Sequence, residues 1–189
     1  AQAYNFPIEL LYLRDDDIPQ YVADGVADIG IVGENELIEK DKDIQVVRKL
    51  GFSKCRLCIA VPRSFEYNDI QDLNGLSIAT SYPKILQDFL DKNNLDCKIR
   101  EISGSVEIGP SIGLSDAIFD IVSTGSTLLS NGLKEVTTVM KSQAVLVASK
   151  TLPEEKQAIL DKLVFRIDAV LRAKKNKYIL LNAPNDKVQ

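Results

Sequence analysis

Short apolar stretches rich in Val, Ile and Leu alternate with helical segments along almost the whole chain. The hydrophobic pattern predicts strands at residues 7–13, 28–32, 44–48, 55–61, 76–80, 97–102, 120–123, 136–140 and 143–149, and helices at 18–26, 34–40, 83–93, 110–119, 126–131 and 153–173. Short buried strands separated by helices are typical of α/β proteins. We therefore expect an α/β fold with mostly parallel sheets.

An internal echo suggests that this pattern occurs twice. One fixed shift along the chain places Asp15 on Glu107, Asp28 on Asp120, Ile29 on Ile121 and Gly33 on Gly125. Each half then has the same order of elements. A strand ends in an acid and is followed by a helix, an aspartate, a short strand and a glycine turn that leads into another helix. Two similar α/β lobes that face each other across a cleft have this pattern, although unrelated α/β units also resemble one another.

Breaks in the pattern suggest where the chain crosses between the lobes. Pro62 and a polar run follow one strand, and the chain returns after residue 136. We expect a discontinuous first lobe at 1–62 plus 137–150, a second lobe at 63–136 and a connecting helix at 151–175. The last of these has one broad apolar face that must pack on another surface.

Composition excludes several classes of function. The 189 residues are 45% hydrophobic and 26% charged, as in ordinary globular proteins, and carry a net charge of −4. An acidic chain lacks the clustered Lys and Arg of a nucleic-acid surface. No apolar run approaches the roughly 20 residues needed to cross a bilayer, and the first residues do not resemble a signal peptide. We expect a cytoplasmic protein that binds neither nucleic acid nor membrane.

The cysteines form no recognisable metal motif. Cys55 and Cys58 make a CxxC, but the surrounding sequence alternates like a strand, which would point the two thiols to opposite faces. With Cys97 as the only other thiol and no histidine in the chain, a zinc site is disfavoured. Three unpaired cysteines fit a reducing compartment.

The stretch DIVSTGSTLLSNGL concentrates small hydroxyl side chains in one turn between a strand and a helix. Ser123, Thr124, Ser126 and Thr127 surround Gly125, whose backbone freedom lets consecutive amides converge on one anion. A helix N-terminus adds free amides and a favourable dipole. The turn predicts a phosphate site; a Ser/Thr-rich helix cap without a ligand is the alternative.

Two acidic residues accompany this turn. Asp120 ends the strand that leads into it, and Glu107 lies in the turn GSVEIGP. A carboxylate beside a phosphate cradle suits a sugar diol or a metal ion, and a phosphorylated ribose carries both a phosphate and a diol. For Glu107, simple exposure at the surface is the alternative.

Tyr82 follows a strand in IATSYPKIL, at the edge where open α/β sheets bind ligands. Its ring is placed to stack on a base, or else only covers the start of a helix that Ser81 would cap. In RDDDIP, one of the three aspartates would cap the next helix, and Arg14 would pair with another. Lys54 and Arg56 are either pyrophosphate partners or surface charge.

Taken together, the motifs RDDDIP, DIGIVGEN, GFSKCRL, IATSYP, GSVEIGP and DAIFDIVSTGSTLLSNGL, in this order, resemble those of the ATP phosphoribosyltransferases, the first enzymes of histidine biosynthesis. The resemblance covers nearly the whole chain. It implies a two-lobed fold of the periplasmic-binding-protein type (type II). It also implies that ATP and phosphoribosyl pyrophosphate are joined, with Mg²⁺, into phosphoribosyl-ATP and pyrophosphate.

The same resemblance implies roles for individual residues. The turn Ser123, Thr124, Gly125, Ser126 and Thr127 would hold the 5'-phosphate, and Glu107 and Asp120 would hold the ribose hydroxyls as the catalytic pair. Tyr82 and Gly33 would lie on the nucleotide side of the cleft, with Arg14 and Asp15 at the rim of the first lobe.

The chain departs from the family pattern at both ends. Family members begin with a strand and a basic, Gly-containing loop, and long-form members end in a regulatory domain that binds histidine as a feedback inhibitor. Residues 176–189 resemble only the start of that domain. We expect a homo-oligomer. The alternatives are a non-enzymatic binding module of the same fold and a regulatory paralogue without catalysis.

Overall fold

The computed structural model describes residue 1 and residues 3–177. These residues form two compact units: Tyr12–Lys150, and Ala1–Leu11 together with the chain from Thr151 onward. Of the helices described, none combines the length and the apolar composition needed to cross a bilayer.

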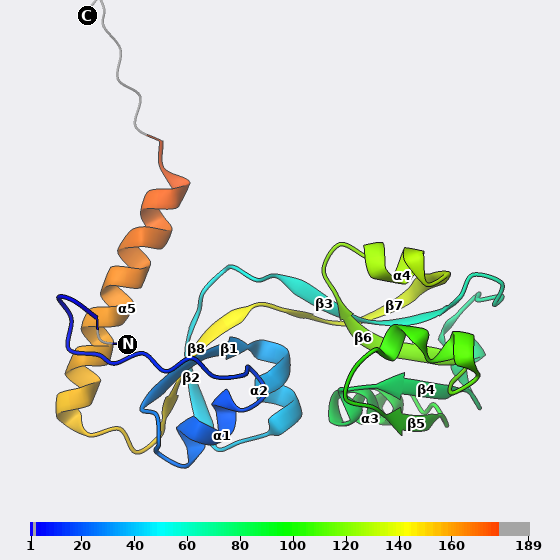
Figure 1. Cartoon of the computed structure of the whole chain (residues 1–189), viewed down its shortest axis with the longest axis horizontal. Helices are drawn as coiled ribbons and strands as arrows, with labels where there is room; N and C mark the ends of the chain where they lie inside the picture. Colours follow the sequence, from blue (N-terminus) through cyan, green and yellow to red (C-terminus); the bar gives the residue numbers. More distant parts are fainter. Residues whose placement is uncertain (2, 178–189) are drawn as a thin grey trace, which may run out of the picture. The chain divides into compact units, whose positions relative to one another are not determined.

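The Tyr12–Lys150 unit contains two sheets, of which the smaller has three strands (Figure 1). Its strands are β1 (Ile29–Gly33), β2 (Ile44–Lys49) and β8 (Ala144–Ser149), in the order β1-β8-β2, with α1 (Ile18–Ala23) and α2 (Glu34–Lys40) beside them. Val22 of α1 packs on alternate strand residues, Val32, Ile44, Val145 and Val147. Val145 and Val147 are two residues apart on β8 and so share the strand face that α1 covers.

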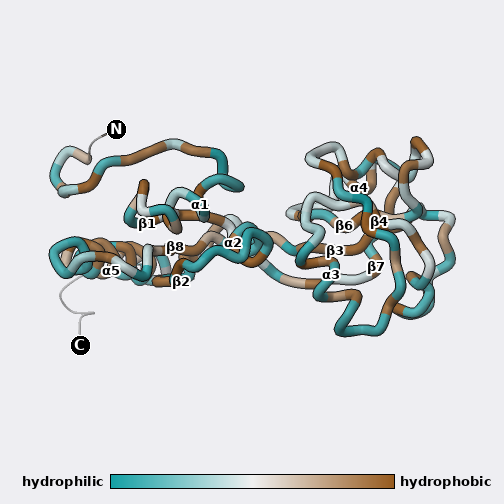
Figure 2. Tube along the Cα trace, turned by 90° about the horizontal axis from the view of Figure 1, so that it is seen from below, coloured by the Kyte–Doolittle hydropathy of each residue, from teal (hydrophilic) through white to brown (hydrophobic). Residues whose placement is uncertain are grey.

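The larger sheet has five strands in the order β5-β4-β6-β3-β7. The strands are β3 (Cys55–Pro62), β4 (Ser77–Thr80), β5 (Lys98–Glu101), β6 (Ala117–Val122) and β7 (Leu133–Ser142). Its helices are α3 (Pro83–Lys92) and α4 (Ser126–Ser130), with three 3₁₀ turns, η1 (Ile70–Leu73), η2 (Val106–Ile108) and η3 (Pro110–Ile112). β3 in the larger sheet and β8 in the smaller sheet are both largely hydrophobic (Figure 2).

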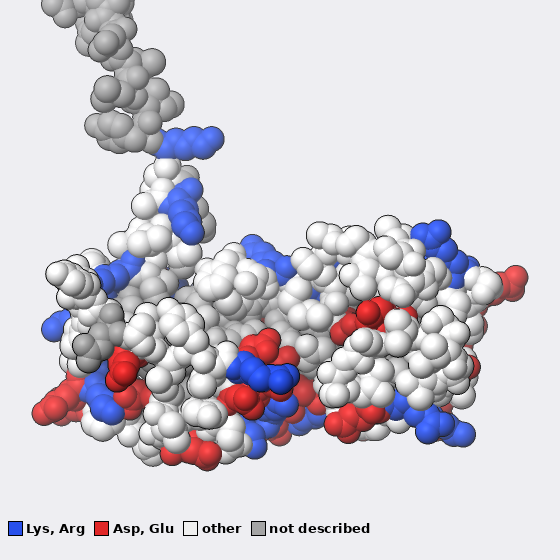
Figure 3. Space-filling view, in the orientation of Figure 1, with Lys and Arg blue, Asp and Glu red and all other residues white. Residues whose placement is uncertain are grey.

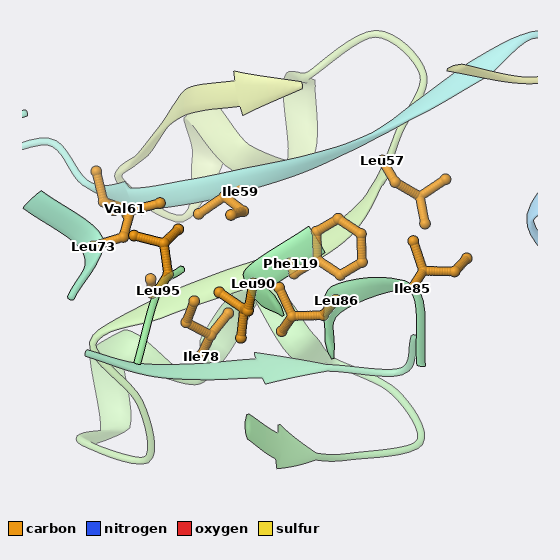
Figure 4. Close-up of a cluster of buried hydrophobic side chains, with 11 residues drawn as sticks. Leu57, Ile59, Val61, Leu73, Ile78, Ile85, Leu86, Leu90, Leu95 and Phe119 are labelled. Carbon is orange, nitrogen blue, oxygen red and sulfur yellow. The ribbon is translucent and has the colours of Figure 1, made fainter. Parts of the chain in front are cut away.

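The two faces of the larger sheet differ in what they bury. On one face α3 packs on large side chains (Figure 4): Leu57, Ile59, Val61, Ile78 and Phe119 from the strands, with Ile85, Leu86 and Leu90 from the helix. On the other face Cys58, Ala60, Ile118 and Val122 lie beneath Val106 of η2 and Leu128 of α4. Asp120 lies two residues from both Ile118 and Val122 on β6. Residues at this spacing share one face of a strand, so the Asp120 carboxylate points toward this second face.

The expectation of mostly parallel sheets is wrong. β8 is antiparallel to both β1 and β2, and β3 is antiparallel to β6 and β7. Among the described strands, the parallel pairs are β4 with β5 and β4 with β6. Since only Gln143 separates β7 from β8, the chain enters the smaller sheet as a return strand rather than through a helical crossover.

Two predicted elements are absent. Residues 110–119 were expected to be a helix, but Ala117, Ile118 and Phe119 are fully buried in β6 and only η3 is helical before Gly113. A short apolar run does not by itself distinguish a buried strand from a helix. Residues 7–13 form no strand either: Glu9 makes only an isolated bridge, and Leu11 and Tyr12 are exposed.

The other predicted elements are confirmed to within a few residues, and the internal echo has a structural counterpart. α2 begins at Glu34 and α4 at Ser126, the two positions that the echo superposes. The expected lobe boundaries stay a prediction.

The second unit contains α5 (Glu154–Lys175), which matches the helix expected at 153–173. In the same unit, the Arg166 guanidinium lies over the Phe6 ring, 4.5 Å from its centroid, a cation–π contact. Most of the segment expected to begin a regulatory domain, residues 178–189, lies outside the described residues.

Candidate functional site

A pocket of about 280 Å³ lies at the carboxyl end of β6. Its walls come from three elements that are distant in sequence: η2, the β6–α4 turn and the start of β3. The lining residues are Cys55, Glu107, Asp120, Ile121, Val122, Ser123, Thr124, Gly125, Thr127 and Leu128. The fold thus brings both predicted carboxylates and four of the five predicted turn residues to one concave site.

The turn after β6 has the backbone geometry that a glycine permits. Gly125 has φ +84°, and a Cβ built there would meet only a Val122 methyl, at 3.9 Å. The dihedral angle, rather than crowding by the protein, therefore requires glycine. The pocket side of Gly125 remains open to a ligand.

The hydroxyls of the turn are partly used within it. Thr124 Oγ1 and Ser126 Oγ lie 3.0 Å apart, and the Ser126 amide lies 3.4 Å from Thr124 Oγ1. Ser126 is the one predicted turn residue that does not line the pocket. Because α4 has only five residues, the amides and hydroxyls of the turn, and not a long helix dipole, are the groups available to an anion.

The carboxylate of Asp120 is affected by burial, by a backbone amide and by the charge of Glu107. Burial raises the pKa of Asp120 and the negative charge of Glu107 raises it further, whereas the Ile121 amide, which donates to Asp120 Oδ1 at 2.7 Å, lowers it. Two half-buried acids that line one pocket favour a ligand that brings hydroxyl donors or positive charge.

The turn that carries Glu107 is tightly packed at Gly109. Glu107 lies in η2 behind Ser105, which has φ +51°. A Cβ at Gly109 would lie 2.8 Å from Ser115 Oγ and 3.2 Å from the Val106 carbonyl oxygen. Gly109 therefore allows this turn to pack closely against Ser115, just before β6.

Tyr82 does not line the pocket but lies near its acidic edge. Its hydroxyl is hydrogen-bonded to Glu36 of α2, and burial, followed by the charges of Glu36, Asp120 and Asp15, raises the pKa of the phenol. The predicted residues Tyr82, Asp15 and Asp120 are thus close enough to interact. Glu36 joins them, and the sequence reasoning missed it.

Glu36 is a buried carboxylate, 7% exposed, on α2, and around this helix acidic and basic side chains intermingle at the surface (Figure 3). Its pKa is raised mainly by burial, and Asp15 contributes in the same direction. Asn35 Nδ2 donates to Glu36 Oε1 at 3.1 Å, and Ser142 Oγ donates to Asn35 Oδ1 at 2.7 Å. In the sequence, the one indication that Glu36 belongs near the site is its position just after Gly33, the residue that the internal echo places on Gly125 of the phosphate turn.

The remaining predicted residues have other surroundings. Gly33 caps α2, and a Cβ there would lie 2.6 Å from Asn35 Oδ1. Arg14, with a side chain 81% exposed, pairs with Asp16 at 3.3 Å and does not line the pocket. Asp15 accepts the Asp16 amide at 3.1 Å.

Two predicted helix caps are wrong. The N-cap of α1 is Asp17, but its side chain makes no capping hydrogen bond. Ser81 does not cap α3, because its hydroxyl donates to the Ile102 carbonyl. Instead, the Glu39 carboxylate of α2 accepts the amides of Lys84 and Ile85 at 2.9 and 3.0 Å. Residues distant in sequence therefore join the start of α3 to α2.

Known proteins resemble the chain over most of its length. The family model described as HisG: ATP phosphoribosyltransferase matches residues 14–169. An ATP phosphoribosyltransferase of Cytophaga hutchinsonii is 63% identical over 187 residues, which cover 99% of this chain and 65% of that protein. One of Bacteroides thetaiotaomicron is 58% identical over 189 residues, covering 100% of this chain and 67% of the relative. The chain therefore spans about two thirds of the length of these relatives.

Solved structures agree on the fold. The Thermotoga maritima ATP phosphoribosyl transferase (HisG:HisZ) complex aligns with a TM-score of 0.75 at 28% identity, covering 85% of this chain and 78% of that one. The substrate binding protein of an amino acid ABC transporter aligns with a TM-score of 0.64 at 14% identity, covering 88% and 75%, which shows a shared fold alone. The two-lobed α/β fold is thus confirmed, and the match over residues 14–169 shows that the chain belongs to the ATP phosphoribosyltransferase family.

Proposed function

We propose that this protein transfers the phosphoribosyl group of phosphoribosyl pyrophosphate to a ring nitrogen of ATP, the first step of histidine biosynthesis. One observation carries the proposal: a single pocket unites Glu107 and Asp120 with the Ser/Thr/Gly turn. A phosphorylated ribose matches this arrangement with its phosphate and its two ring hydroxyls.

In this proposal the turn Ser123–Thr127 holds the 5'-phosphate. The free hydroxyls and amides donate hydrogen bonds to the phosphate oxygens, and the open space at Gly125 admits the anion close to the backbone. Glu107 and Asp120 accept hydrogen bonds from the ribose hydroxyls. The site thereby orients the anomeric carbon with respect to the incoming base.

The chemistry requires no strong base. The adenine nitrogen attacks C1' with its own lone pair, the bond from C1' to the pyrophosphate oxygen breaks, and pyrophosphate leaves with the bonding electrons. Positive charge develops on the ribose ring, where the carboxylates of Glu107 and Asp120 stabilise it electrostatically. Tyr82 and the turn at Gly33 would contact the nucleotide, with Arg14 and Asp15 at the rim.

Magnesium fits this site only as an ion that arrives with the substrate. Among the described residues, no group of three or more Asp, Glu, Cys or His side chains is arranged to hold a metal. Mg²⁺ is commonly held by one or two carboxylates together with substrate phosphates, and Glu107 and Asp120 are the carboxylates that the pocket offers. When bound, the ion neutralises charge on the pyrophosphate.

Feedback inhibition by histidine, assembly into a homo-oligomer and a cytoplasmic location stay predictions. They derive from the family resemblance and composition, and the described residues do not test them.

Binding of phosphoribosyl pyrophosphate tests the proposal most directly. Titration calorimetry with Mg²⁺ present should show one site that Asp120→Asn weakens, and incubation with ATP should yield phosphoribosyl-ATP, followed by its ultraviolet absorbance. As a matched control, Asp116→Asn changes an aspartate that accepts bonds from Ser77 away from the pocket. Equal affinity in wild type and Asp120→Asn would contradict the assignment of Asp120 to the ribose.

A further inference from the structure

The strand pairing that supports the proposed phosphate turn stops just before the turn begins. β6 is paired with β3 as far as Val122, which lies opposite Arg56. The next residue, Ser123, is the first of the turn. Arg56 Nη1 donates a hydrogen bond to the Ser123 carbonyl oxygen at 3.1 Å. The side chain of Arg56 therefore continues the attachment of β6 to β3 by one residue beyond the ladder.

Glu135 of β7 orients the guanidinium. Arg56 Nε lies 3.0 Å from both carboxylate oxygens of Glu135, and Arg56 Nη2 lies 2.7 Å from Oε2. A guanidinium held through several N–H groups is fixed in its plane. Its remaining donor, Nη1, then points in a set direction, toward Ser123.

Two further side chains fix Glu135. Cys58 Sγ and Thr138 Oγ1 each donate to Glu135 Oε1 at 2.9 Å. The hydrogen bonds from Arg56, and after them those from Cys58 and Thr138, lower the pKa of Glu135 to about 2, so the carboxylate is ionised at neutral pH. Burial and the hydrogen bond to Glu135 raise the pKa of the Cys58 thiol to about 12, so it remains a protonated donor.

These contacts form one connection across three adjacent strands, from Glu135 on β7 through Arg56 on β3 to Ser123 after β6. Arg56 does not line the pocket, and the charge of Glu135 balances its own. It is therefore poorly placed to serve as a direct partner of a pyrophosphate, one of the two roles considered from the sequence.

We propose that Arg56 is a positioning residue that holds the Ser123–Thr127 turn in its anion-binding conformation, and that Glu135 orients Arg56 for this task. The inference rests on the proposed function, because it assigns a purpose to the turn. Two measurements separate the positioning role of Arg56 from the proposed function of the turn. One is made on the free protein and the other with phosphoribosyl pyrophosphate.

The first measurement is hydrogen–deuterium exchange of the free protein. Arg56→Met should accelerate exchange of the amides at 123–127 several-fold, whereas amides of β1 and β8 should exchange as in wild type and so report that the unit stays folded. Lys141→Met is the matched control, because Lys141 is an exposed residue opposite Arg56 on β7. Unchanged exchange at 123–127 in Arg56→Met would overturn the proposal.

Arg56→Lys provides a second, milder variant. A single ammonium retains the positive charge beside Glu135 but cannot also reproduce the planar contacts that direct Nη1 to Ser123. Arg56→Lys should therefore resemble Arg56→Met in its exchange. Recovery of the wild-type exchange by Lys would show that charge alone suffices, which contradicts a positioning role.

The second measurement is the affinity for phosphoribosyl pyrophosphate with Mg²⁺. Loss of an ordered turn should weaken binding about tenfold in Arg56→Met and Arg56→Lys, since a charge-assisted hydrogen bond no longer orders the turn. Lys141→Met should stay within about twofold of wild type. If wild type does not bind phosphoribosyl pyrophosphate, the proposed function is wrong, and the exchange experiment still decides whether Arg56 orders the turn. Accelerated exchange with unchanged affinity would overturn the positioning role.

Discussion

Removal of the Glu39 carboxylate should destabilise α3, although Glu39 belongs to another helix. α3 starts with Tyr82 as its N-cap, and no side chain of its own caps it. Glu39 accepts the Lys84 and Ile85 amides at 2.9 and 3.0 Å instead. Glu39→Ala leaves both amides without this acceptor.

The magnitude follows from the two contributions that the carboxylate makes. Loss of an N-cap acceptor costs about 1 kcal/mol, and loss of a negative charge at a helix N-terminus costs up to about 1 kcal/mol more. We therefore expect Glu39→Ala to lower the free energy of unfolding by about 2 kcal/mol. For a chain of this length the melting temperature should fall by about 4–8 °C.

Urea denaturation followed by far-ultraviolet circular dichroism measures this change, because the chain has no Trp for fluorescence. Glu34→Ala is the matched control on the same helix: its carboxylate pairs with Lys49 at the surface, an interaction worth at most about 1 kcal/mol. Glu39→Gln should fall between wild type and Glu39→Ala, since one acceptor oxygen remains. If Glu39→Ala destabilises the protein no more than Glu34→Ala, the proposed cap does not operate in solution.

Three further perturbations test the pocket and the core. Because the pKa of Asp120 is raised in the folded state, folding favours its protonated form; the contribution of Asp120 to the stability of wild type therefore declines as pH rises from the unfolded value of about 4 through the folded pKa. Asp120→Asn should remove this decline, so that pH-dependent denaturation shows a variant more stable than wild type at pH 7 yet defective in substrate binding; equal stability at pH 7 would contradict the burial argument. Gly125→Ala should lower stability by about 1–2 kcal/mol, as should Gly132→Ala, which also has a positive φ, but only the former should weaken phosphoribosyl pyrophosphate binding in a calorimetric titration; equal weakening by both would argue against the turn as the site. Phe119→Ala should lower the free energy of unfolding by about 3–5 kcal/mol in urea, against less than about 1 kcal/mol for the exposed Ile121→Ala on the same strand, and comparable losses would refute the assignment of the core face.

Local patterns were sufficient for most of the secondary structure and for the chemistry of the turn. α2 begins and ends at its predicted residues, and β2, β3, β4 and α3 are within one or two residues of expectation. Their apolar periodicity, with Pro83 at the start of α3, is a property of neighbouring residues. Glu107, Asp120 and the hydroxyl turn were likewise predicted to lie together, because each follows a strand or turn at one edge of a sheet.

Strand direction and the identity of contacts distant in sequence were decided by the tertiary structure. β6 is a strand and not a helix because Ile118 and Phe119 fill opposite faces of a central sheet position, which the run AIFD does not reveal. Three contacts join residues more than forty positions apart in the sequence: Glu36 with Tyr82, Glu39 with the start of α3, and Glu135 with Arg56. A carboxylate in the sequence carries no signal of its partner, because its pairing depends on which elements the fold brings within a few ångströms of each other.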